Sequence, residues 1–333
     1  MSKPQKSDPG NSGNNSKQSL FQKLRPFVTG LVPLFILAHF SHHGVGAMLN
    51  PLMPMIRDDL HLNLTQAGLL MSAFTITNGF AQLPAGWLAD RVGARFMILL
   101  AITGVAAAGF LIGFSNSLWT LVACLVIAAI FGGGYHPASA AAISSSVPVE
   151  IRGRALGIHL IGGTSAFWIL PLVITPIAAT WGWRMPFRII PIPIALLGVL
   201  VYFLLGKKSL SIEKNKQPAN GAPVNTKLMD WGKLVPFMVL SVLAGSLIAS
   251  AASFLSFYAV DELHVPDATV PLLVAVSPAV GLVMAPVGGY LSDRFGGLQV
   301  ILILGLAAVQ PLVEWGANGR STHLETSRVL GNH

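Results

Sequence analysis

Long apolar segments separated by short polar ones run through most of this 333-residue chain. A helix that spans a lipid bilayer needs about 20 mostly apolar residues. Segments near that length lie at 27–49, 67–89, 96–114, 118–143, 155–179, 186–206, 234–260, 270–291 and 298–313. They lack period-two alternation and are about twice as long as a barrel strand. The pattern therefore predicts an all-α membrane protein with nine spans.

The composition supports lipid rather than water as the solvent around these segments. Hydrophobic residues make up 53% of the chain, charged residues make up 10%, and the mean hydropathy is +0.66. Soluble proteins carry about 25% charged residues. So few charges do not cover the surface of a soluble protein of this size. The alternative of a very apolar soluble protein is disfavoured, because the apolar segments are too long and too many.

The basic residues alternate with the apolar segments and do not form one patch, although the formal net charge is +8. This distribution excludes a nucleic-acid binder. If the N-terminus is cytoplasmic, sixteen lysines and arginines fall inside and three fall outside. Cytoplasmic loops of membrane proteins are enriched in these residues. We therefore expect a multi-pass protein of the cell inner (plasma) membrane with a cytoplasmic N-terminus.

The polar segments divide the chain into five regions. We expect a disordered cytoplasmic tail at 1–26 and an N-terminal bundle of six helices at 27–206. A cytoplasmic linker rich in Lys, Asn, Pro and Ser follows at 207–233. An incomplete C-terminal bundle of about three helices occupies 234–313, and the polar, aberrant tail at 314–333 cannot span a bilayer.

One motif occurs at the same place in both halves of the chain. Residues 86–93 and 289–296 share the pattern G-x-L-x-D-R-x-G, and each copy ends the second span of its half. Two six-helix halves with this signature resemble the major facilitator superfamily, whose halves are parallel repeats. The resemblance implies a major facilitator fold of twelve spans. We therefore expect a C-terminally truncated chain that lacks spans ten to twelve; the alternative is a genuine nine-helix protein.

A second resemblance rests mainly on the fourth and fifth spans. Residues 132–137 read G-x-x-x-H-P, and residues 152–163 read R-G-x-A-x-x-I-x-x-x-G-G. Together with residues 37–40 and 50–54, they are similar to the fosmidomycin-resistance group of the superfamily. The resemblance implies a secondary active transporter that moves a small organic compound by alternating access and proton-coupled efflux. It does not identify fosmidomycin as the substrate.

The repeated motif supplies the first set of candidate residues. In the family, it latches the two halves together in one access state and releases them in the other. Its glycines permit close helix approach and unusual dihedral angles. The alternative is a solvated loop that only sets topology. The latch candidates are Gly86, Asp90, Arg91, Gly93, Arg95, Asp293 and Arg294.

Histidines inside the apolar spans supply the second set. An ionisable residue inside a span is costly, so it suggests a function. His39, His42 and His43 are spaced i, i+3 and i+4, which places them on one helix face. His136 precedes a proline that we expect to kink its span. Histidine titrates near physiological pH, so these four and His159 are candidates for the substrate and proton pathway. The alternative is interhelical hydrogen bonding.

Other functions have little basis in the sequence. The single cysteine, Cys124, excludes an intrachain disulfide and disfavours a cysteine-based metal site. We recognise no nucleophile–base pair or metal cluster, so we expect no enzyme activity, no cofactor and no metal. The expected protein is a monomer whose partners are a small organic solute, protons and the lipid bilayer. The alternative to a transporter is a transport-inactive remnant or a membrane-bound receptor.

Overall fold

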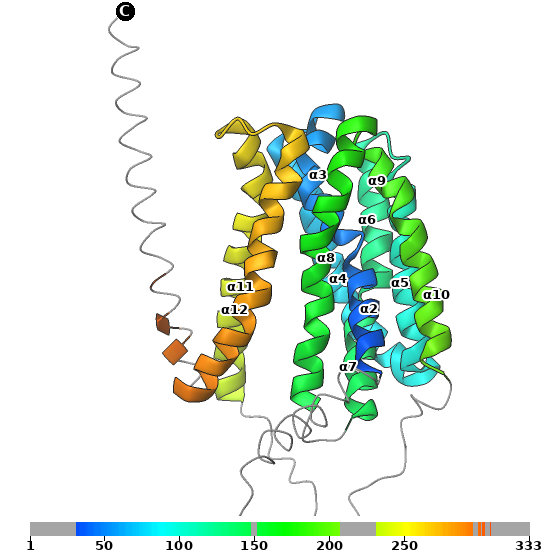
Figure 1. The fold of residues 1–333 in the computed structure, drawn as a ribbon, viewed down its shortest axis with the longest axis vertical. Coiled ribbons are helices and arrows are strands. Elements are labelled where there is room, and N and C mark those ends of the chain that lie inside the picture. The colour runs from blue at the N-terminus through cyan, green and yellow to red at the C-terminus, as the bar shows by residue number, and fades with distance from the viewer. Residues whose placement is uncertain are drawn as a thin grey trace, which may run out of the picture. The chain divides into compact units, whose positions relative to one another are not determined.

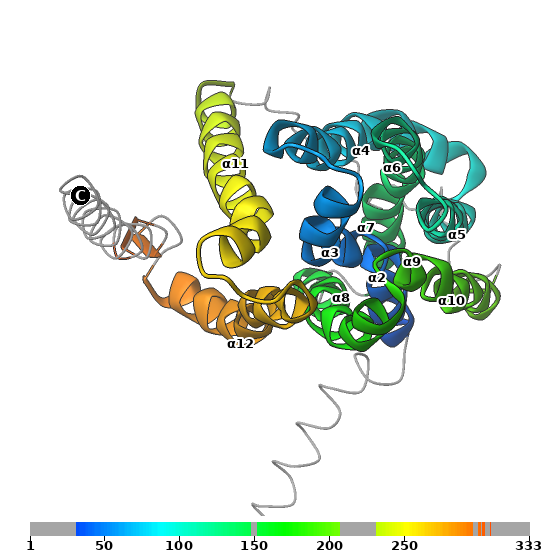
Figure 2. The ribbon, with the colours of Figure 1, turned by 90° about the horizontal axis from the view of Figure 1, so that it is seen from above.

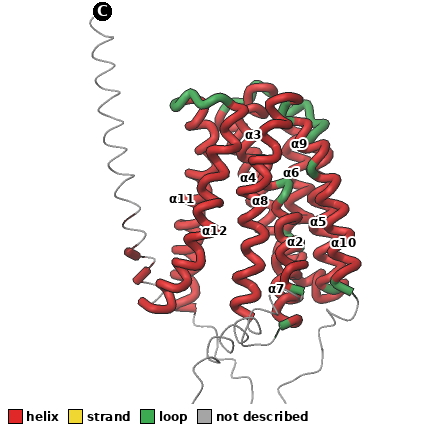
Figure 3. The backbone as a smooth tube through the Cα atoms, in the orientation of Figure 1, coloured by secondary structure: helices red, strands yellow, loops and turns green. Residues whose placement is uncertain are grey.

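The computed structural model describes residues 31–147, 152–206 and 231–295, together with 299, 300, 302, 303 and 307. Throughout this described part the regular elements are helices and no strand occurs, which confirms the predicted all-α class (Figures 1 and 3). The predicted tails at 1–26 and 314–333 lie outside the described residues, as do nearly all of the linker and most of the ninth span. Contacts divide the chain into two compact units, Met1–Ala279 and Val280–His333.

Six stretches of the described residues are long and apolar enough to cross a membrane. They are Val32–Asp59, Ala94–Ile112, Leu118–Ser146, Ala155–Trp181, Arg184–Leu204 and Asp267–Met284. Two further helices, α4 with 29 residues and α11 with 31, have the length of a span but are not among the six. Large apolar side chains are strongly exposed on several helices, including Phe80, Leu83 and Phe203. Such an apolar exterior suits contact with lipid.

The first predicted span is two helices, α2 (Val32–His43) and α3 (Gly46–Asp59). Together they form one stretch, Val32–Asp59, that is long and apolar enough to cross a membrane, so the first predicted span is present; it breaks at Gly44 and ends at Asp59 and not at Leu49. A Cβ on Gly44 would collide with the side chain of Ile194. The glycine thus allows close approach of another helix at the break.

The second and third spans are α4 (Leu64–Val92) and α5 (Ala94–Ile112), joined by one residue. Asn63 and Gln66 form a reciprocal capping box that begins α4. Gly93 joins the two helices with φ +90, a conformation that residues with a side chain rarely adopt. The single-residue connection makes α4 and α5 consecutive helices that meet at a sharp turn.

The fourth span is also divided, into α6 (Leu118–Gly132) and α7 (Tyr135–Ser146). The break, at Gly133 and Gly134, confirms the kink predicted from Pro137, because a proline ring clashes with the carbonyl group four residues before it and removes one helical hydrogen bond. A Cβ on Gly133 would lie 2.6 Å from Ala81 Cβ and 2.9 Å from the Ala81 carbonyl carbon. Close packing against α4 therefore explains Gly133, and at Gly134 a Cβ would lie 2.7 Å from Met97 Cε of α5.

The remaining helices of the first half are α8 (Arg152–Trp181), α9 (Arg184–Ile189) and α10 (Pro191–Leu204). The sixth predicted span is thus two helices that meet at Ile190. Contacts place α2 against α8, α10, α5 and α7, so α2 lies inside the first half of the chain (Figure 2). The position of α2 brings its histidines into the interior.

The second half begins with α11 (Trp231–Asp261), a short 3-10 helix η2 (Asp267–Thr269) and α12 (Val270–Phe295). The bounds of α11 and α12 agree with the predicted spans to within a few residues. Helix α11 contacts α3. The boundary between the two units, at Ala279, falls inside α12.

Candidate functional site

The five predicted histidines come together from three helices. The His39 ring centroid lies 4.1 Å from that of His159 and 4.8 Å from that of His43, and the His39–His136 separation is 5.5 Å. His42 lies 4.8 Å from His43 by the same measure. Helix α2 supplies three of these side chains, while α7 and α8 supply one each. We call the five residues the histidine cluster.

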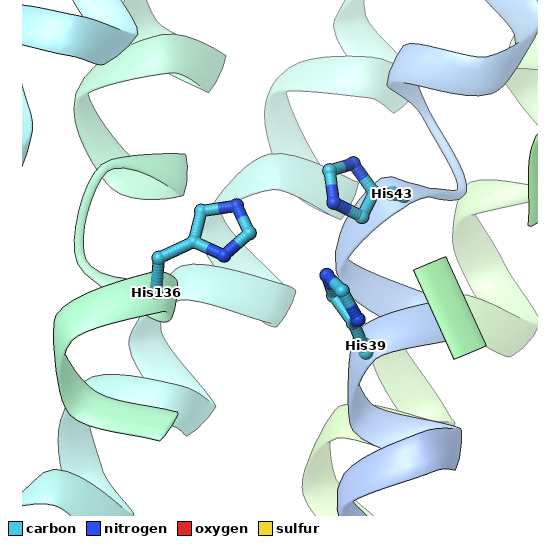
Figure 4. A group of neighbouring side chains, drawn as sticks. All are labelled: His39, His43 and His136. Carbon is cyan, nitrogen blue, oxygen red and sulfur yellow. The ribbon is translucent and has the colours of Figure 1, made fainter. Parts of the chain in front are cut away.

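Figure 4 shows how two sides of the cluster face each other. His39 and His43 project from α2 towards His136, which projects from the beginning of α7. Tyr135, the neighbour of His136, stacks on His42 with ring centroids 4.4 Å apart. The break between α6 and α7 precedes these two residues, so it sets the direction in which α7 presents them.

Backbone carbonyl groups orient two of the buried imidazoles. His39 Nδ1 donates to the carbonyl oxygen of His159 at 3.0 Å, and His159 Nδ1 donates to that of Phe35 at 3.1 Å. A carbonyl oxygen only accepts, so each Nδ1 carries the hydrogen and each neutral ring keeps its lone pair on Nε2. His39 and His159 are 3% and 4% exposed. Within the described residues, His39 Nε2 and His42 Nδ1 have no hydrogen-bond partner.

Two glycines of α8 allow this close arrangement. A Cβ on Gly163 would lie 2.6 Å from His39 Cε1, 2.8 Å from His39 Nε2 and 2.8 Å from His43 Cδ2. A Cβ on Gly162 would collide with the backbone of Ile36. The glycine pair in the sequence pattern therefore brings α8 against both the backbone of α2 and its histidine rings.

The cluster borders two cavities. The larger, of about 460 Å³, is lined by His39, His43, His136, Leu160, Gly163, Thr164, Phe167 and Pro278. A smaller one of about 230 Å³ is lined by His42, His43, Gly46, Leu49, Met71, Phe74, Thr75, Asn78, Val105, His136 and Phe167. His43, His136 and Phe167 border both. Apart from the imidazoles, the only polar side chains in these linings are two threonines and one asparagine.

The predicted latch residues of the first half lie at the α4–α5 turn. The Arg91 guanidinium carbon lies 3.7 Å from the centroid of the Trp87 ring. Arg95 Nε donates to the Tyr202 carbonyl oxygen at 2.6 Å, and its guanidinium lies over the Tyr202 ring at 3.8 Å. Arg95 thus joins the beginning of α5 to α10. Asp90 is exposed in the last turn of α4.

The remaining latch candidates are Gly86 and Gly93 in the first half of the chain, and Asp293 and Arg294 in the second. A Cβ on Gly86 would make an ordinary 3.8 Å contact with Pro137, and Gly93 is the turn itself. Asp293 and Arg294 lie at the end of α12, where the Arg294 guanidinium is 5.5 Å from the Phe295 ring centroid. The first and second copies of the motif belong to different units. The latch role therefore stays a prediction.

A charged contact between α3 and α11 was missed in the sequence analysis. Arg57 Nη1 and Nη2 donate to the two carboxylate oxygens of Asp261 at 2.6 and 2.9 Å, and Arg57 Nε donates to Asp58 at 2.7 Å. The Arg57 guanidinium also lies 5.1 Å from the Phe257 ring centroid. The sequence offered one signal, because Arg57 and Asp261 are opposite charges in loops predicted on the same side.

The same two helices are also joined by an asparagine. Asn50 Nδ2 donates to the Ala252 carbonyl oxygen at 2.9 Å. Ser256 Oγ lies 3.0 Å from the Asn50 carbonyl oxygen and 3.1 Å from its Oδ1. Arg57 and Asn50 therefore make two separate polar contacts along the α3–α11 pair.

Known proteins resemble this chain over most of its length. The sequence profile of the Major Facilitator Superfamily matches residues 35–313. Multidrug resistance protein MdtG of Yersinia enterocolitica is 26% identical over 319 residues, which cover 91% of this chain and 75% of that protein. The probable sulfoacetate transporter SauU of Cupriavidus necator is 31% identical over 171 residues, which cover 50% of this chain and 38% of that protein.

Solved structures share the fold. A bacterial homologue of the human lysosomal transporter Spinster gives a TM-score of 0.61 at 21% identity, and the match covers 80% of this chain and 61% of that one. A peptide transporter, POT, gives a TM-score of 0.59 at 16% identity, with 80% and 69% covered. This chain thus spans less than two thirds of the Spinster homologue.

Proposed function

Because this chain belongs to the major facilitator superfamily, we propose that it is a secondary active transporter that moves a small organic compound by alternating access. We propose that the compound is exported and that its export is coupled to the movement of protons. The family and the named relatives make it a multi-pass membrane transporter and not an enzyme. The solute, the coupling ion and the access cycle are the proposal. We also propose a cytoplasmic N-terminus, as the distribution of lysine and arginine predicts.

The observation that carries the proposal is the histidine cluster beside a cavity. Ionisable side chains inside membrane spans are rare, and they commonly mark substrate or proton pathways. Here five of them meet between α2, α7 and α8, and three border a cavity of about 460 Å³. Pockets of roughly 300–1,000 Å³ hold drug-sized molecules. The volume and the sparse polar lining suit a small, mostly apolar organic compound.

Imidazoles are the proposed carriers of the coupling proton. The buried polar residues of the described first half include histidines and serines but no aspartate or glutamate. His39 Nε2 holds a lone pair with no hydrogen-bond partner among the described residues. His39 lines the cavity, and its ring can accept a proton at Nε2 while Nδ1 keeps its hydrogen bond to the His159 carbonyl oxygen.

The contact between Arg57 and Asp261 suits alternating access. In the predicted topology both residues lie at the outside end, one on each half of the chain. A bidentate pair there would hold the halves together in the state that is open to the inside. Breaking this pair would be part of opening outwards.

The relatives' names indicate small organic compounds as the substrate class and do not single out one compound. Multidrug resistance proteins and a probable sulfoacetate transporter are both similar to this chain. We therefore propose a test with an organic cation and two small organic anions. Purified full-length chain in proteoliposomes would be given a pH gradient, and flux of ethidium, sulfoacetate and fosmidomycin would be measured.

The expected result is gradient-dependent flux of at least one compound. We expect His39→Asn to reduce it by at least about tenfold, equivalent to about 1.4 kcal/mol in the transport barrier. His61→Asn is the matched control, because His61 is exposed and lies outside the cluster. Flux of none of the three compounds by correctly folded protein would contradict the proposal and favour a receptor or an inactive membrane protein.

A further inference from the structure

We propose that His39, His43 and His136 form a binding site for a divalent transition-metal cation such as Zn²⁺. The site lies on the wall of the larger cavity. It goes beyond solute transport: the cation would take the same His39 Nε2 lone pair as the proposed coupling proton, so the two would compete whatever the transported compound is. No other part of the described structure gathers as many potential nitrogen ligands.

Distances among the ring nitrogens support the site. Each of the three residues offers one ligand nitrogen, and these atoms all lie within 4.8 Å of one another. Zinc–nitrogen bonds of about 2.0–2.1 Å in a tetrahedron put the nitrogens roughly 3.3 Å apart. His43 and His136 are only partly buried and border both cavities, so their rings have room to rotate inwards.

The hydrogen bond of His39 prepares it as a ligand. A metal-binding histidine commonly donates its other ring N–H to a carbonyl or carboxylate oxygen, which fixes the ring and directs the lone pair at the metal. His39 Nδ1 makes this bond to the His159 carbonyl at 3.0 Å. His39 is 3% exposed, and its Nε2 has no hydrogen-bond partner among the described residues. A bound cation would satisfy this buried nitrogen, which is otherwise costly to leave unpaired.

The ligand type selects the class of ion. Neutral imidazole suits Zn²⁺, Cu²⁺ and Ni²⁺, whereas Mg²⁺ and Ca²⁺ need oxygen ligands. The linings of both cavities contain no aspartate or glutamate. Three protein ligands leave one tetrahedral position open. Because all three ligands line the larger cavity, water or an anionic group of a solute there would complete the coordination.

Metal binding to the purified full chain tests the proposal directly. The protein would carry no histidine tag and would be stripped of metal in detergent. Zn²⁺ would then be titrated against a chromophoric chelator, and Co²⁺ would report the geometry through its visible absorption. We expect one equivalent of Zn²⁺ and the intense Co²⁺ bands of a four-coordinate site. This assay needs no transport, so its failure is distinct from failure of the proposed function.

Variants separate the site from the remaining histidines. We expect His43→Ala and His136→Ala each to weaken Zn²⁺ binding by at least about tenfold. The quadruple variant His61→Asn, His264→Asn, His323→Asn and His333→Asn removes every histidine outside the cluster and should bind normally. If this quadruple variant loses binding while the two alanine variants keep it, the proposal is wrong.

One variant guards against misfolding as the explanation. His136→Cys replaces the imidazole by a thiolate, which is also a zinc ligand. It should retain Zn²⁺ binding and add a sulfur-to-Co²⁺ charge-transfer band to the Co²⁺ spectrum. Retained binding without that band would show that residue 136 does not contact the metal, and would overturn the assignment of the third ligand.

Discussion

The histidine cluster and the α4–α5 turn place their ionisable groups in opposite surroundings. The cluster lies between α2, α7 and α8, where His39, His42 and His159 are buried. The turn carries Asp90 and Arg91, which are both exposed at the end of α4. The buried rings contact one another, whereas the turn's arginine stacks on an aromatic ring.

The difference in burial gives the ionisable groups of the two regions different energetic costs. A buried imidazole nitrogen without a hydrogen-bond partner costs free energy, and that cost is tolerated where the group acts on a solute, proton or ion. An exposed charge costs little and stabilises little. We therefore expect changes in the cluster to affect transport strongly and changes at the turn to affect it weakly.

The largest effect is expected from Gly163→Ala. Its Cβ would enter the space of the His39 and His43 rings, at 2.6 and 2.8 Å from their carbons. Overpacking of this kind typically costs 1–3 kcal/mol. We expect at least a tenfold loss of transport and of Zn²⁺ affinity, measured in proteoliposomes and by titration. The matched control is Gly157→Ala on the same helix, where an added Cβ meets no described atom within 4 Å. Equal effects of the two variants would contradict this explanation.

A smaller effect is expected from Gly93→Ala at the turn. Here an added Cβ meets no described atom within 4 Å, but φ is +90. The cost therefore comes from the backbone and not from neighbours, because φ +90 with ψ 143 lies near a region that essentially only glycine adopts, and it should be about 1–3 kcal/mol of stability. Thermal unfolding in detergent would measure it, with Zn²⁺ affinity unchanged. A loss of Zn²⁺ affinity as large as that of Gly163→Ala would contradict the separation of the two regions.

The ion pair between α3 and α11 should have a coupling free energy of about 1 kcal/mol or less. Asp261 is 38% exposed in its side chain, so solvent and salt screen the pair. Initial transport rates of Arg57→Ala, Asp261→Ala and the double variant would give the coupling, which should change rates by about fivefold at most and fall at high salt. Glu262→Gln is the control, because Glu262 is the exposed neighbour of Asp261. Zero coupling at low salt would argue against a role of this contact in the access cycle.

The smallest effect is expected from Arg91→Ala. Removing the stack on Trp87 should reduce the free energy of unfolding by about 0.5–1 kcal/mol, the range for an exposed cation–π pair. Arg91→Lys keeps the charge and should lose less. Thermal unfolding and transport would be measured for both. A tenfold loss of transport in Arg91→Lys would show that the turn matters as much as the cluster, and would support the latch.

Residues near each other in sequence were predicted well. Apolar segments of bilayer length indicated the helices, because lipid demands about 20 apolar residues whatever lies beside them. The i, i+3, i+4 spacing placed His39, His42 and His43 on one face of a helix, since helical geometry depends only on spacing. The repeated motif led to the family, which the match over residues 35–313 confirms.

Contacts between distant segments needed the tertiary structure. The close approaches to Gly44 and Gly133 are made by Ile194 and Ala81, which lie on other helices. The order of residues along one helix does not determine which side chains it will meet from another.

The sequence by itself determined that this chain crosses a membrane many times, and which residues inside the spans can ionise. Only the tertiary structure decided that His136 of α7 meets His39 and His43 of α2, with α8 packed close enough to orient His39 through a carbonyl group. The physical reason is that hydrophobicity and helical periodicity can be read from residues that are close together along the chain. A site depends on packing between helices, which Gly162 and Gly163 of α8 permit here.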